Sequence, residues 1–267
     1  MSFYSICFSP TGGTEKVLEL LAEGLGEQPE PVDLSDMGTD FSGIHLKSED
    51  VCFIGVPSFG GRVPETALRR LADIKGNDAA AILVVSFGNR AYDDTLLELQ
   101  DAALECGFSV MAAVAGVTEH SIMRQYGAGR PDDADQAELK EFGKRIRNAL
   151  EKKNRMVTEG EPDRTPRIDT GLKLPGNRPF REYHGVPFTP KAGKSCTGCG
   201  ICASLCPIGA IPAGNPGETD SSSCISCMRC ITVCPAGARS LNKAMLFAAS
   251  QKMKKEFAQR KGNELFL

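Results

Sequence analysis

The sequence lacks the features of several large classes of protein. Its 267 residues contain no run of about 18 consecutive apolar residues, so no transmembrane helix is predicted. The net charge of −3 argues against nucleic acid as a partner. Tryptophan is absent, so phenylalanine and tyrosine must supply any aromatic surface for a ligand. The first five residues carry no basic segment of a secretory signal, and we therefore expect a cytoplasmic protein with reduced thiols.

Cysteine is abundant, and most of it lies near the C-terminus. Two runs follow the pattern C-x2-C-x2-C-x3-C-P, and their members are Cys196, Cys199, Cys202, Cys206 and then Cys224, Cys227, Cys230, Cys234. This doubled pattern is typical of a bacterial ferredoxin with two 4Fe–4S clusters, in which the fourth cysteine of each run binds the other cluster. We therefore predict that Cys234 completes the cluster of the first run and that Cys206 completes the cluster of the second.

Other chemistry fits these cysteines less well. Structural zinc uses four ligands per ion, usually as two C-x2-C pairs separated by a long gap. Disulfides require an oxidising compartment. The three cysteines outside the runs, Cys7, Cys52 and Cys106, stand among apolar residues and are predicted to be buried thiols of the core.

The first part of the chain, residues 1–153, alternates short apolar segments with segments of helical period. We predict clear strands at 3–8, 51–56, 80–86 and 108–117, with a weaker one near 31–34. Helices are expected at 15–25, 64–74, 94–106 and 132–153. Strands without polar alternation, joined by helices, predict an α/β fold with a five-stranded parallel sheet that is covered on both faces.

The rest of the chain divides into three segments. Residues 154–190 are rich in proline yet contain apolar residues, which favours a strap that packs against one or both domains over a mobile linker. Residues 191–240 are expected to form a small α+β domain around the clusters, and 241–267 a C-terminal helix. That helix carries Lys252, Lys254 and Lys255, which form either a solvated face or a docking site for an acidic redox partner.

A turn rich in glycine and hydroxyl groups joins the first strand to the first helix. Its candidate ligand-binding residues are Ser9, Thr11, Gly12, Gly13 and Thr14. Such a turn binds phosphate through backbone N–H groups, hydroxyls and the helix N-terminus. Neither a Walker A lysine nor a G-x-G-x-x-G pattern is present, so the turn suits a monophosphate such as that of FMN. A purely structural helix cap is the alternative.

Two further loops follow the third and fourth strands. Their candidate residues are Pro57, Ser58, Phe59, Gly60, Gly61 and then Ser86, Phe87, Gly88, Asn89, Tyr92, Asp93. In a sheet ordered 2-1-3-4-5 these loops emerge beside the turn, at the edge where ligands bind. Phe59 and Tyr92 can stack on a flavin ring, with ordinary packing as the alternative, and Asp93 can contact the flavin or cap the next helix.

The segment 118–131, after the fifth strand, is longer than an ordinary connection. It is either a lid that brings His120 or Arg124 near the cofactors, or a surface loop.

Residues 9–14 resemble the phosphate motif of flavodoxins, and residues 88–92 resemble their third loop, with Asn89 where many flavodoxins have aspartate. Phe59 stands where some flavodoxins use tryptophan. Over about residues 1–240, the order of segments is similar to the flavodoxin–ferredoxin fusion proteins of anaerobic bacteria and archaea. The resemblance implies a flavodoxin-like domain with FMN and a ferredoxin domain with two 4Fe–4S clusters.

The predicted function is electron transfer between FMN and the clusters, with exchange of low-potential electrons with redox partner proteins in anaerobic metabolism. No catalytic side chain is required. One alternative is an FMN-dependent reductase of a small molecule, with His120, Tyr92 or Arg90 beside the ring. Another is an electron-transfer subunit of a larger complex. The oligomeric state stays open, with a homodimer as one option.

Overall fold

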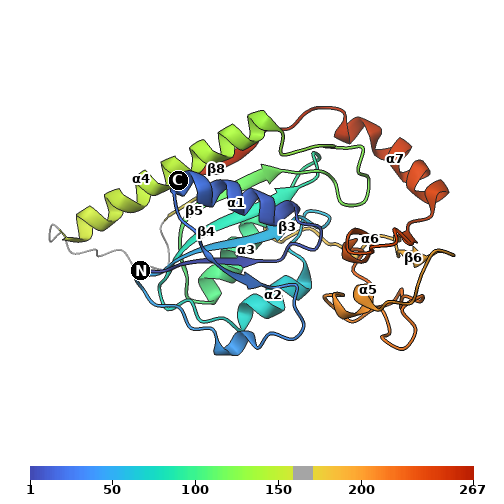
Figure 1. Cartoon of the computed structure of the whole chain (residues 1–267). Coiled ribbons are helices and arrows are strands. Elements are labelled where there is room, and N and C mark those ends of the chain that lie inside the picture. The colour runs from blue at the N-terminus through green and yellow to red at the C-terminus, as the bar shows by residue number, and fades with distance from the viewer. Residues whose placement is uncertain (159–170) are drawn as a thin grey trace.

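The computed structural model describes residues 1–158 and 171–267, and its main element is a six-stranded sheet (Figure 1). The strands stand in the order β2-β1-β3-β4-β5-β8. Their bounds are β1 Phe3–Cys7, β2 Glu30–Asp33, β3 Val51–Pro57, β4 Ala80–Phe87, β5 Ser109–Val117 and β8 Glu264–Phe266. The first five are parallel, which confirms the predicted α/β sheet of order 2-1-3-4-5.

The sixth strand, β8, runs antiparallel to β5 and was not predicted from the sequence. The C-terminal residues 241–267 were expected to form a helix, but the helix α7 covers only Lys243–Phe257. The chain then turns back to the sheet, where Val114 pairs with Leu265. This strand covers an edge of the sheet that would otherwise expose unpaired N–H and C=O groups.

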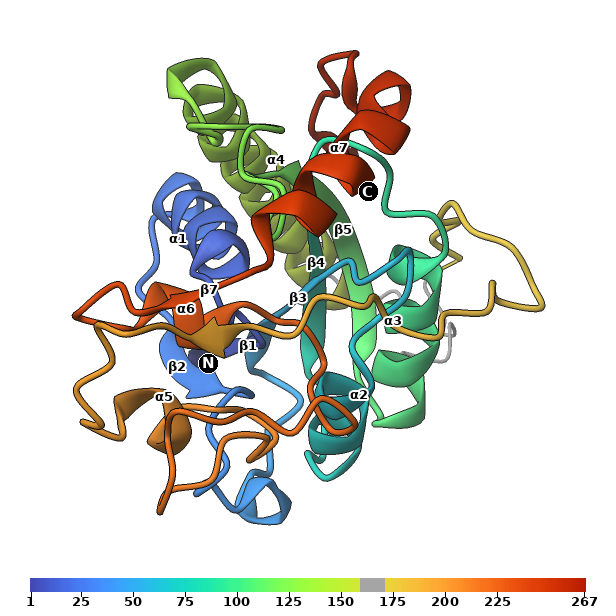
Figure 2. The ribbon, with the colours of Figure 1, turned by 90° about the vertical axis from the view of Figure 1, so that its right-hand side faces the viewer.

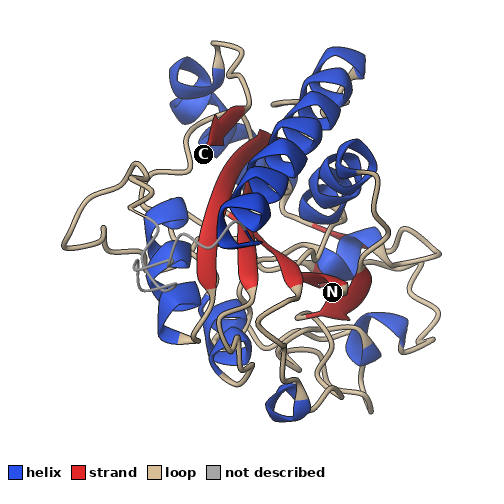
Figure 3. Ribbon diagram, turned by 90° about the vertical axis from the view of Figure 1, so that its left-hand side faces the viewer, coloured by secondary structure: helices blue, strands red, loops and turns tan. Residues whose placement is uncertain are grey.

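Helices cover both faces of the sheet. Helices α1 (Gly13–Leu25) and α4 (Asp133–Thr158) lie above it in Figure 1, while α2 (Glu65–Ala72) and α3 (Thr95–Glu105) lie below. Figure 3 shows the molecule from the left-hand side of Figure 1, and in this view α4 runs along one face of the strands. Side chains alternate between two apolar clusters: Phe53 and Val84 pack toward α1 and α4, whereas Ile54 and Leu83 pack toward α2 and α3. Burial on both faces explains why these strands are apolar throughout.

The two helices above the sheet approach each other unusually closely, because each has a glycine at the contact. A Cβ on Gly24 would lie 2.0 Å from the carbonyl oxygen of Lys140, and one on Gly143 would lie 2.2 Å from that of Leu21. Contact of the two backbones fixes α1, whose first turn borders the glycine-rich turn described below.

The cysteine-rich segment forms a small α+β module beside the carboxyl ends of the strands. It contains the two-stranded sheet of β6 (Lys191–Ala192) and β7 (Arg239–Ser240), with the short helices α5 (Ile201–Ser204) and α6 (Arg229–Thr232). Figure 2 shows the module in front of the strand ends, with α7 above it. The Arg70 guanidinium on α2 ties the two parts together, since it donates to the carbonyl oxygens of Leu34 and of Pro207, the latter at 2.7 Å.

The described part of the proline-rich segment, residues 171–190, contacts both parts of the molecule. The Asp94 carboxylate, before α3, accepts hydrogen bonds from the backbone of Asn177 at 2.9 Å and of Arg181 at 2.7 Å. Farther along, the carbonyl oxygen of Val186 accepts a hydrogen bond from the Ser226 hydroxyl of the cysteine-rich module at 3.2 Å. The predicted strap also included residues 159–170, which lie outside the described residues.

Two smaller features complete the fold. A 3-10 helix, η1 (Phe41–Gly43), follows β2, and Asn242 caps α7 because its side-chain oxygen accepts from the backbone of Ala244 at 3.0 Å. Within the described residues, no helix combines the length and the apolar character that crossing a lipid bilayer requires.

Candidate functional site

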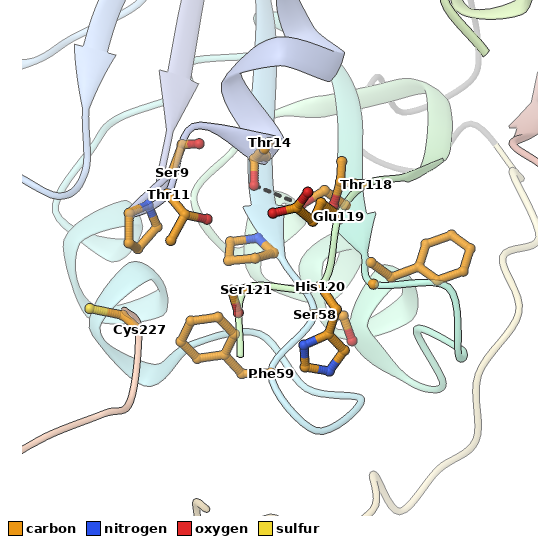
Figure 4. A pocket seen from close by; sticks show the side chains of 16 residues that line it. Ser9, Thr11, Thr14, Ser58, Phe59, Thr118, Glu119, His120, Ser121 and Cys227 are labelled. Carbon is orange, nitrogen blue, oxygen red and sulfur yellow. Dashed lines mark hydrogen bonds between the residues drawn. The ribbon is translucent and has the colours of Figure 1, made fainter. Parts of the chain in front are cut away.

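A first cavity lies at the carboxyl edge of the sheet between β1 and β3 (Figure 4). Four connections of the α/β part and one residue of the cysteine-rich module line it. The lining residues are Ser9, Pro10, Thr11, Gly13, Thr14, Pro57, Ser58, Phe59, Ser86, Phe87, Gly88, Thr118, Glu119, His120, Ser121 and Cys227. This is the point of the sheet where the strand order reverses, as expected for a ligand site in a doubly wound fold.

The glycine-rich turn is shaped by one glycine and two hydroxyl groups. Gly12 has a φ of +85°, a left-handed conformation that turns the chain into α1 at little steric cost. The Ser9 hydroxyl accepts a hydrogen bond from the backbone of Glu15 at 3.0 Å. The Thr14 hydroxyl bonds that of Ser86 at 2.8 Å, and both side chains are buried. The turn is therefore fixed against the end of β4.

The polar groups around the first cavity suit an anion held by neutral donors. Among the described residues, no lysine or arginine lines it, and its polar side chains are mostly hydroxyls. One carboxylate is present, that of Glu119, and it is paired with the Arg124 guanidinium. Backbone N–H groups at the start of α1 remain the main donors for a phosphate.

A second cavity adjoins the first and is more apolar. The two share Ser58, Phe59, Gly88, His120 and Ser121. Three segments distant in sequence supply most of the remaining wall, through Tyr183, Val186, Phe188, Ile225, Ser226, Met253 and Phe257. An apolar cavity with a few polar groups, joined to an anion site, has the character of a site for a flat ring that carries a phosphate.

Two glycines allow close packing around these cavities. A Cβ on Gly60 would lie 2.2 Å from the Tyr183 ring, so the tyrosine lies directly on the loop after β3. A Cβ on Gly88 would lie 2.7 Å from that of His120, so the histidine lies directly on the loop after β4. Larger residues at either position would push the wall apart.

His120 lines both cavities and is held in one tautomer. Its Nδ1 atom accepts hydrogen bonds from the backbone N–H groups of Ile122 at 3.1 Å and Met123 at 3.2 Å. The proton of the neutral ring is therefore on Nε2. Burial, assisted by the positive charge of Arg90, lowers the pKa of His120 to about 4. At neutral pH it is thus an uncharged hydrogen-bond donor.

Three predicted flavin ligands lie outside the linings of both cavities, and their side chains bond other parts of the chain. Asn89 is buried, and its side-chain amide group bonds the C-terminal segment: it donates to Phe257 O at 3.0 Å and accepts from Lys261 N at 3.0 Å. Tyr92 packs edge-on against Phe87, and its hydroxyl donates to Glu264 at 3.1 Å.

Asp93 is the third of these residues, and it pairs with Arg90 and Arg181. The loop after β4 resembles a flavin loop in sequence, but here its polar side chains anchor the C-terminal segment and the strap. Gly12 also lies outside both linings, where it shapes the turn.

The other predicted residues are brought together as the sequence suggested. Those lining one or both cavities are Ser9, Thr11, Gly13, Thr14, Pro57, Ser58, Phe59, Gly60, Gly61, Ser86, Phe87 and Gly88. Sequence reasoning missed the residues of the strap, the cysteine-rich module and α7 that close the second cavity. The only available signal was the apolar character of the proline-rich segment, which does not reveal what that segment covers.

The eight cysteines fall into two sets in space. Cys196, Cys199, Cys202 and Cys234 line one small cavity of about 330 Å³. Cys206 lies close enough to Cys224, Cys227 and Cys230 for its charge to act on all three. These are the two crossed sets expected of a two-cluster ferredoxin, each with one cysteine from the other run.

The two sets have different surroundings. Burial raises the pKa of Cys227 to about 12 and that of Cys230 to about 11, which describes free thiols in an apolar site. In the other set Cys199 is exposed, and the backbone N–H of Ala238 donates to the Cys234 sulfur at 3.3 Å, which lowers the pKa of that thiol. Among the described residues, no three His, Cys, Asp or Glu are placed to hold a single metal ion.

The second cysteine set lies directly against the two cavities. Cys227 lines the first cavity, and Figure 4 places it at the edge, beside Phe59. Ile225 and Ser226, from the same loop, line the second cavity. Three consecutive residues of this cysteine loop, Ile225, Ser226 and Cys227, therefore form part of the walls of the two cavities.

Comparison with known proteins agrees with this arrangement of cysteines. Residues 195–238 match the family model of the 4Fe-4S dicluster domain. The dicluster domain holds two 4Fe–4S clusters, so the match supports two such clusters here and a redox role for the chain. Among curated proteins, no match to the chain was found.

Each of the solved structures named next matches a little over half of this chain. The two-electron reduced flavodoxin of Megasphaera elsdenii is 19% identical, with 55% of this chain and 99% of that chain covered at a TM-score of 0.38. The metal-soaked flavodiiron core of Synechocystis sp. is 17% identical, and the match covers 57% of this chain and 36% of that chain at a TM-score of 0.41. The rubredoxin:oxygen oxidoreductase of Desulfovibrio gigas is 20% identical (57% and 36%, TM-score 0.38). The chain thus spans about a third of the length of the last two proteins, and the fold assignment rests on the strand order.

Proposed function

We propose that the chain is an electron-transfer protein that binds FMN across the two cavities and passes electrons between it and two 4Fe–4S clusters. The first cavity takes the phosphate and the second takes the ring. FMN exchanges two electrons with a partner or single electrons with the clusters, which each carry one. The dicluster match supports the clusters, and the cavity geometry supports the flavin.

The side chains bind and orient the cofactor. We expect the backbone N–H groups after Gly12 and the hydroxyl of Thr11 to bind the phosphate end. Phe59 is the one predicted aromatic residue that reaches both cavities, which makes it the candidate stacking partner of the ring. His120 presents its Nε2–H group as a donor that stays uncharged at neutral pH.

The observation that carries the proposal is the contact between the cysteine loop and both cavities. Because Ile225, Ser226 and Cys227 form part of the walls, a bound flavin and the cluster of that loop are neighbours within one chain. Electrons then pass between them without any need for the two domains to meet by diffusion.

The surroundings of the second cavity favour a carrier over a reductase. Tyr183 of the strap, Ile225 of the cysteine-rich module and Met253 of α7 line it from three different segments, which favours a ring covered by the chain over one open to a small substrate. Cys199, by contrast, is exposed, so its cluster is the site that exchanges electrons with partner proteins. The lysines of α7 are exposed as well, which suits docking to an acidic redox partner.

The proposal is tested by anaerobic flash photoreduction, which delivers single electrons to protein that contains both cofactors. Absorbance in the flavin and cluster bands is expected to change in opposite directions after the first reduction. That phase should have a rate independent of protein concentration, because the transfer occurs within one chain. A phase whose rate rises in proportion to protein concentration, or no second phase, would overturn the proposal.

A variant with weakened FMN binding provides the internal check. Thr14→Val removes the hydroxyl that bonds Ser86 and fixes the turn, so we expect lower FMN retention with both clusters intact. The intramolecular phase should diminish in step with FMN content. Thr39→Val is the matched control, since that residue is exposed and its hydroxyl donates to Asp36 instead of to the turn.

A further inference from the structure

A single buried arginine distinguishes the two cysteine sets. Arg239, on β7, is only 3% exposed. Its Nε–H group donates to the Cys202 sulfur at 3.1 Å. Its two other nitrogens donate to neutral oxygens alone, namely Thr219 Oγ1 at 2.7 Å and the carbonyl oxygens of Pro190, Pro216 and Glu218.

The charge of Arg239 has no carboxylate to balance it. Throughout residues 1–158 and 171–267, no aspartate or glutamate forms an ion pair with this guanidinium. Arginine stays protonated in proteins, and a buried cation without a counter-charge is costly. The group that Cys202 faces must therefore be anionic, as a thiolate-bound cluster is. The unbalanced charge of Arg239 thus supports a cluster at these cysteines independently of their spacing in the sequence.

We propose that Arg239 makes the cluster held by Cys196, Cys199, Cys202 and Cys234 the more easily reduced of the two. Reduction adds an electron to the cluster, and a nearby cation with an N–H group on a ligand sulfur stabilises the added charge. The direct contact is to Cys202 only. At longer range the charge also acts on Cys224 and Cys230, so the second cluster feels a weaker effect of the same sign.

The surroundings of the two sets reinforce this difference. The set with Cys202 includes the exposed Cys199, where water also stabilises added charge, whereas Cys227 and Cys206 of the other set are buried. The cluster nearer the solvent is therefore the higher-potential one, and the cluster beside the cavities is the lower-potential one. In the singly reduced protein, the electron therefore resides mainly on the cluster that contains Cys199, where a partner protein can reach it.

The test is an anaerobic redox titration of the full chain, followed by electron paramagnetic resonance. Arg239→Gln removes the charge and keeps a polar side chain. We expect both cluster potentials to fall, with the larger fall on the cluster that contains Cys202. Lys194→Gln is the matched control, because it removes one positive charge from an exposed position near the same cluster and should change either potential much less.

The signals are assigned with Cys199→Ser, since an oxygen ligand changes the spectrum of its own cluster. In the unmodified protein, the higher-potential signal should be the one that this substitution alters. If it belongs to the other cluster, or if Arg239→Gln shifts both potentials equally, the proposal is overturned. The wild-type assignment alone decides the order of potentials if the Arg239 variant loses its iron.

A second variant separates charge from hydrogen bonding. Arg239→Lys keeps the positive charge but not the planar set of donors, so its potentials should fall between those of the wild type and Arg239→Gln. The inference rests on the crossed cysteine assignment and not on the flavin. Its failure is therefore distinguishable from failure of the proposed flavin–cluster transfer, because both cluster potentials can be measured whether or not FMN is bound.

Discussion

His120 shows how one residue acquires a definite chemical state from its surroundings. An isolated histidine changes charge near neutral pH, but here two backbone N–H groups bond to Nδ1 and the ring packs edge-on against Phe257 with centroids 5.2 Å apart. Protonation would require Nδ1 to become a donor facing two other donors. Burial and this hydrogen bonding therefore keep the ring neutral.

The depressed pKa of His120 predicts a pH dependence of stability. Since the folded pKa is about 4 and the unfolded value about 6.5, the unfolded state binds a proton first as the pH falls. Stability should be intact above about pH 6.5 and be lost progressively down to about pH 4, by on the order of 3 kcal/mol from this group. The free energy of unfolding is measured by urea denaturation of the wild type and of His120→Gln at pH 7, 6 and 5. An equal decline in both proteins would contradict the prediction.

At the scale of elements, the C-terminal segment after α7 closes the second cavity and completes the sheet. Phe257, the last residue of α7, stacks on Tyr126 with ring centroids 4.3 Å apart and also lines the cavity. The chain then passes Asn89. Within this segment, the side-chain oxygen of Asn263 accepts a hydrogen bond from the backbone N–H of Val117 at 2.9 Å, and the following strand β8 pairs with β5. A segment of few residues thus couples the edge of the sheet to the wall of the site.

Asn89 is the residue on which this closure depends most. Asn89→Ala removes its bonds to Phe257, Gln259 and Lys261, and the buried carbonyl oxygen of Phe257 loses this donor. We expect a loss of about 1–3 kcal/mol of stability and faster amide exchange at residues 257–266. FMN should also bind more weakly, because α7 loses its anchor. Hydrogen exchange by mass spectrometry measures the local effect. Asn148→Ala, at an exposed position of α4, is the control and should leave exchange in that segment unchanged.

Across the whole molecule, the two halves are joined at several points that surround the candidate site. Arg70 bonds the carbonyl oxygen of Pro207, next to Cys206, and the Arg229 guanidinium lies 3.6 Å from the carboxylate of Asp33 at the end of β2. Crossed cysteine sets mean that neither half of the module can hold its cluster alone. Each cluster therefore depends on the fold of the whole module, which in turn rests on the sheet.

Cys206→Ala tests the crossing. Cys206 belongs to the first run in sequence but lies with Cys224, Cys227 and Cys230 in space. We expect iron content to fall from about eight atoms per chain to about four, with loss of the cluster of the second run. Iron analysis and paramagnetic resonance after anaerobic isolation measure this. Cys106→Ser is the control, because that thiol bonds Leu71 far from the module. Loss restricted to the cluster marked by Cys199→Ser would refute the crossed assignment.

Local patterns predicted the parts of this protein that depend on short stretches of chain. The strands around Phe53 and Leu83 could be predicted from the sequence, because burial on both faces requires apolar residues throughout. The turn around Gly12 was visible because its conformation and its donors come from consecutive residues. The partners of Asn89 and Tyr92 could not be predicted, because these side chains bond to a segment more than 150 residues away in the sequence.

The sequence alone determined the number and kind of cysteine ligands, the parallel sheet and the position of the turn, because each is encoded in residue type and short-range spacing. Only the tertiary structure decided that the cysteine loop forms a wall of both cavities, that α7 and β8 return to the sheet, and that Arg239 contacts one cysteine set. These features arise from packing between segments remote in sequence. Such packing depends on the combined shape of all the surfaces involved, which no local pattern contains.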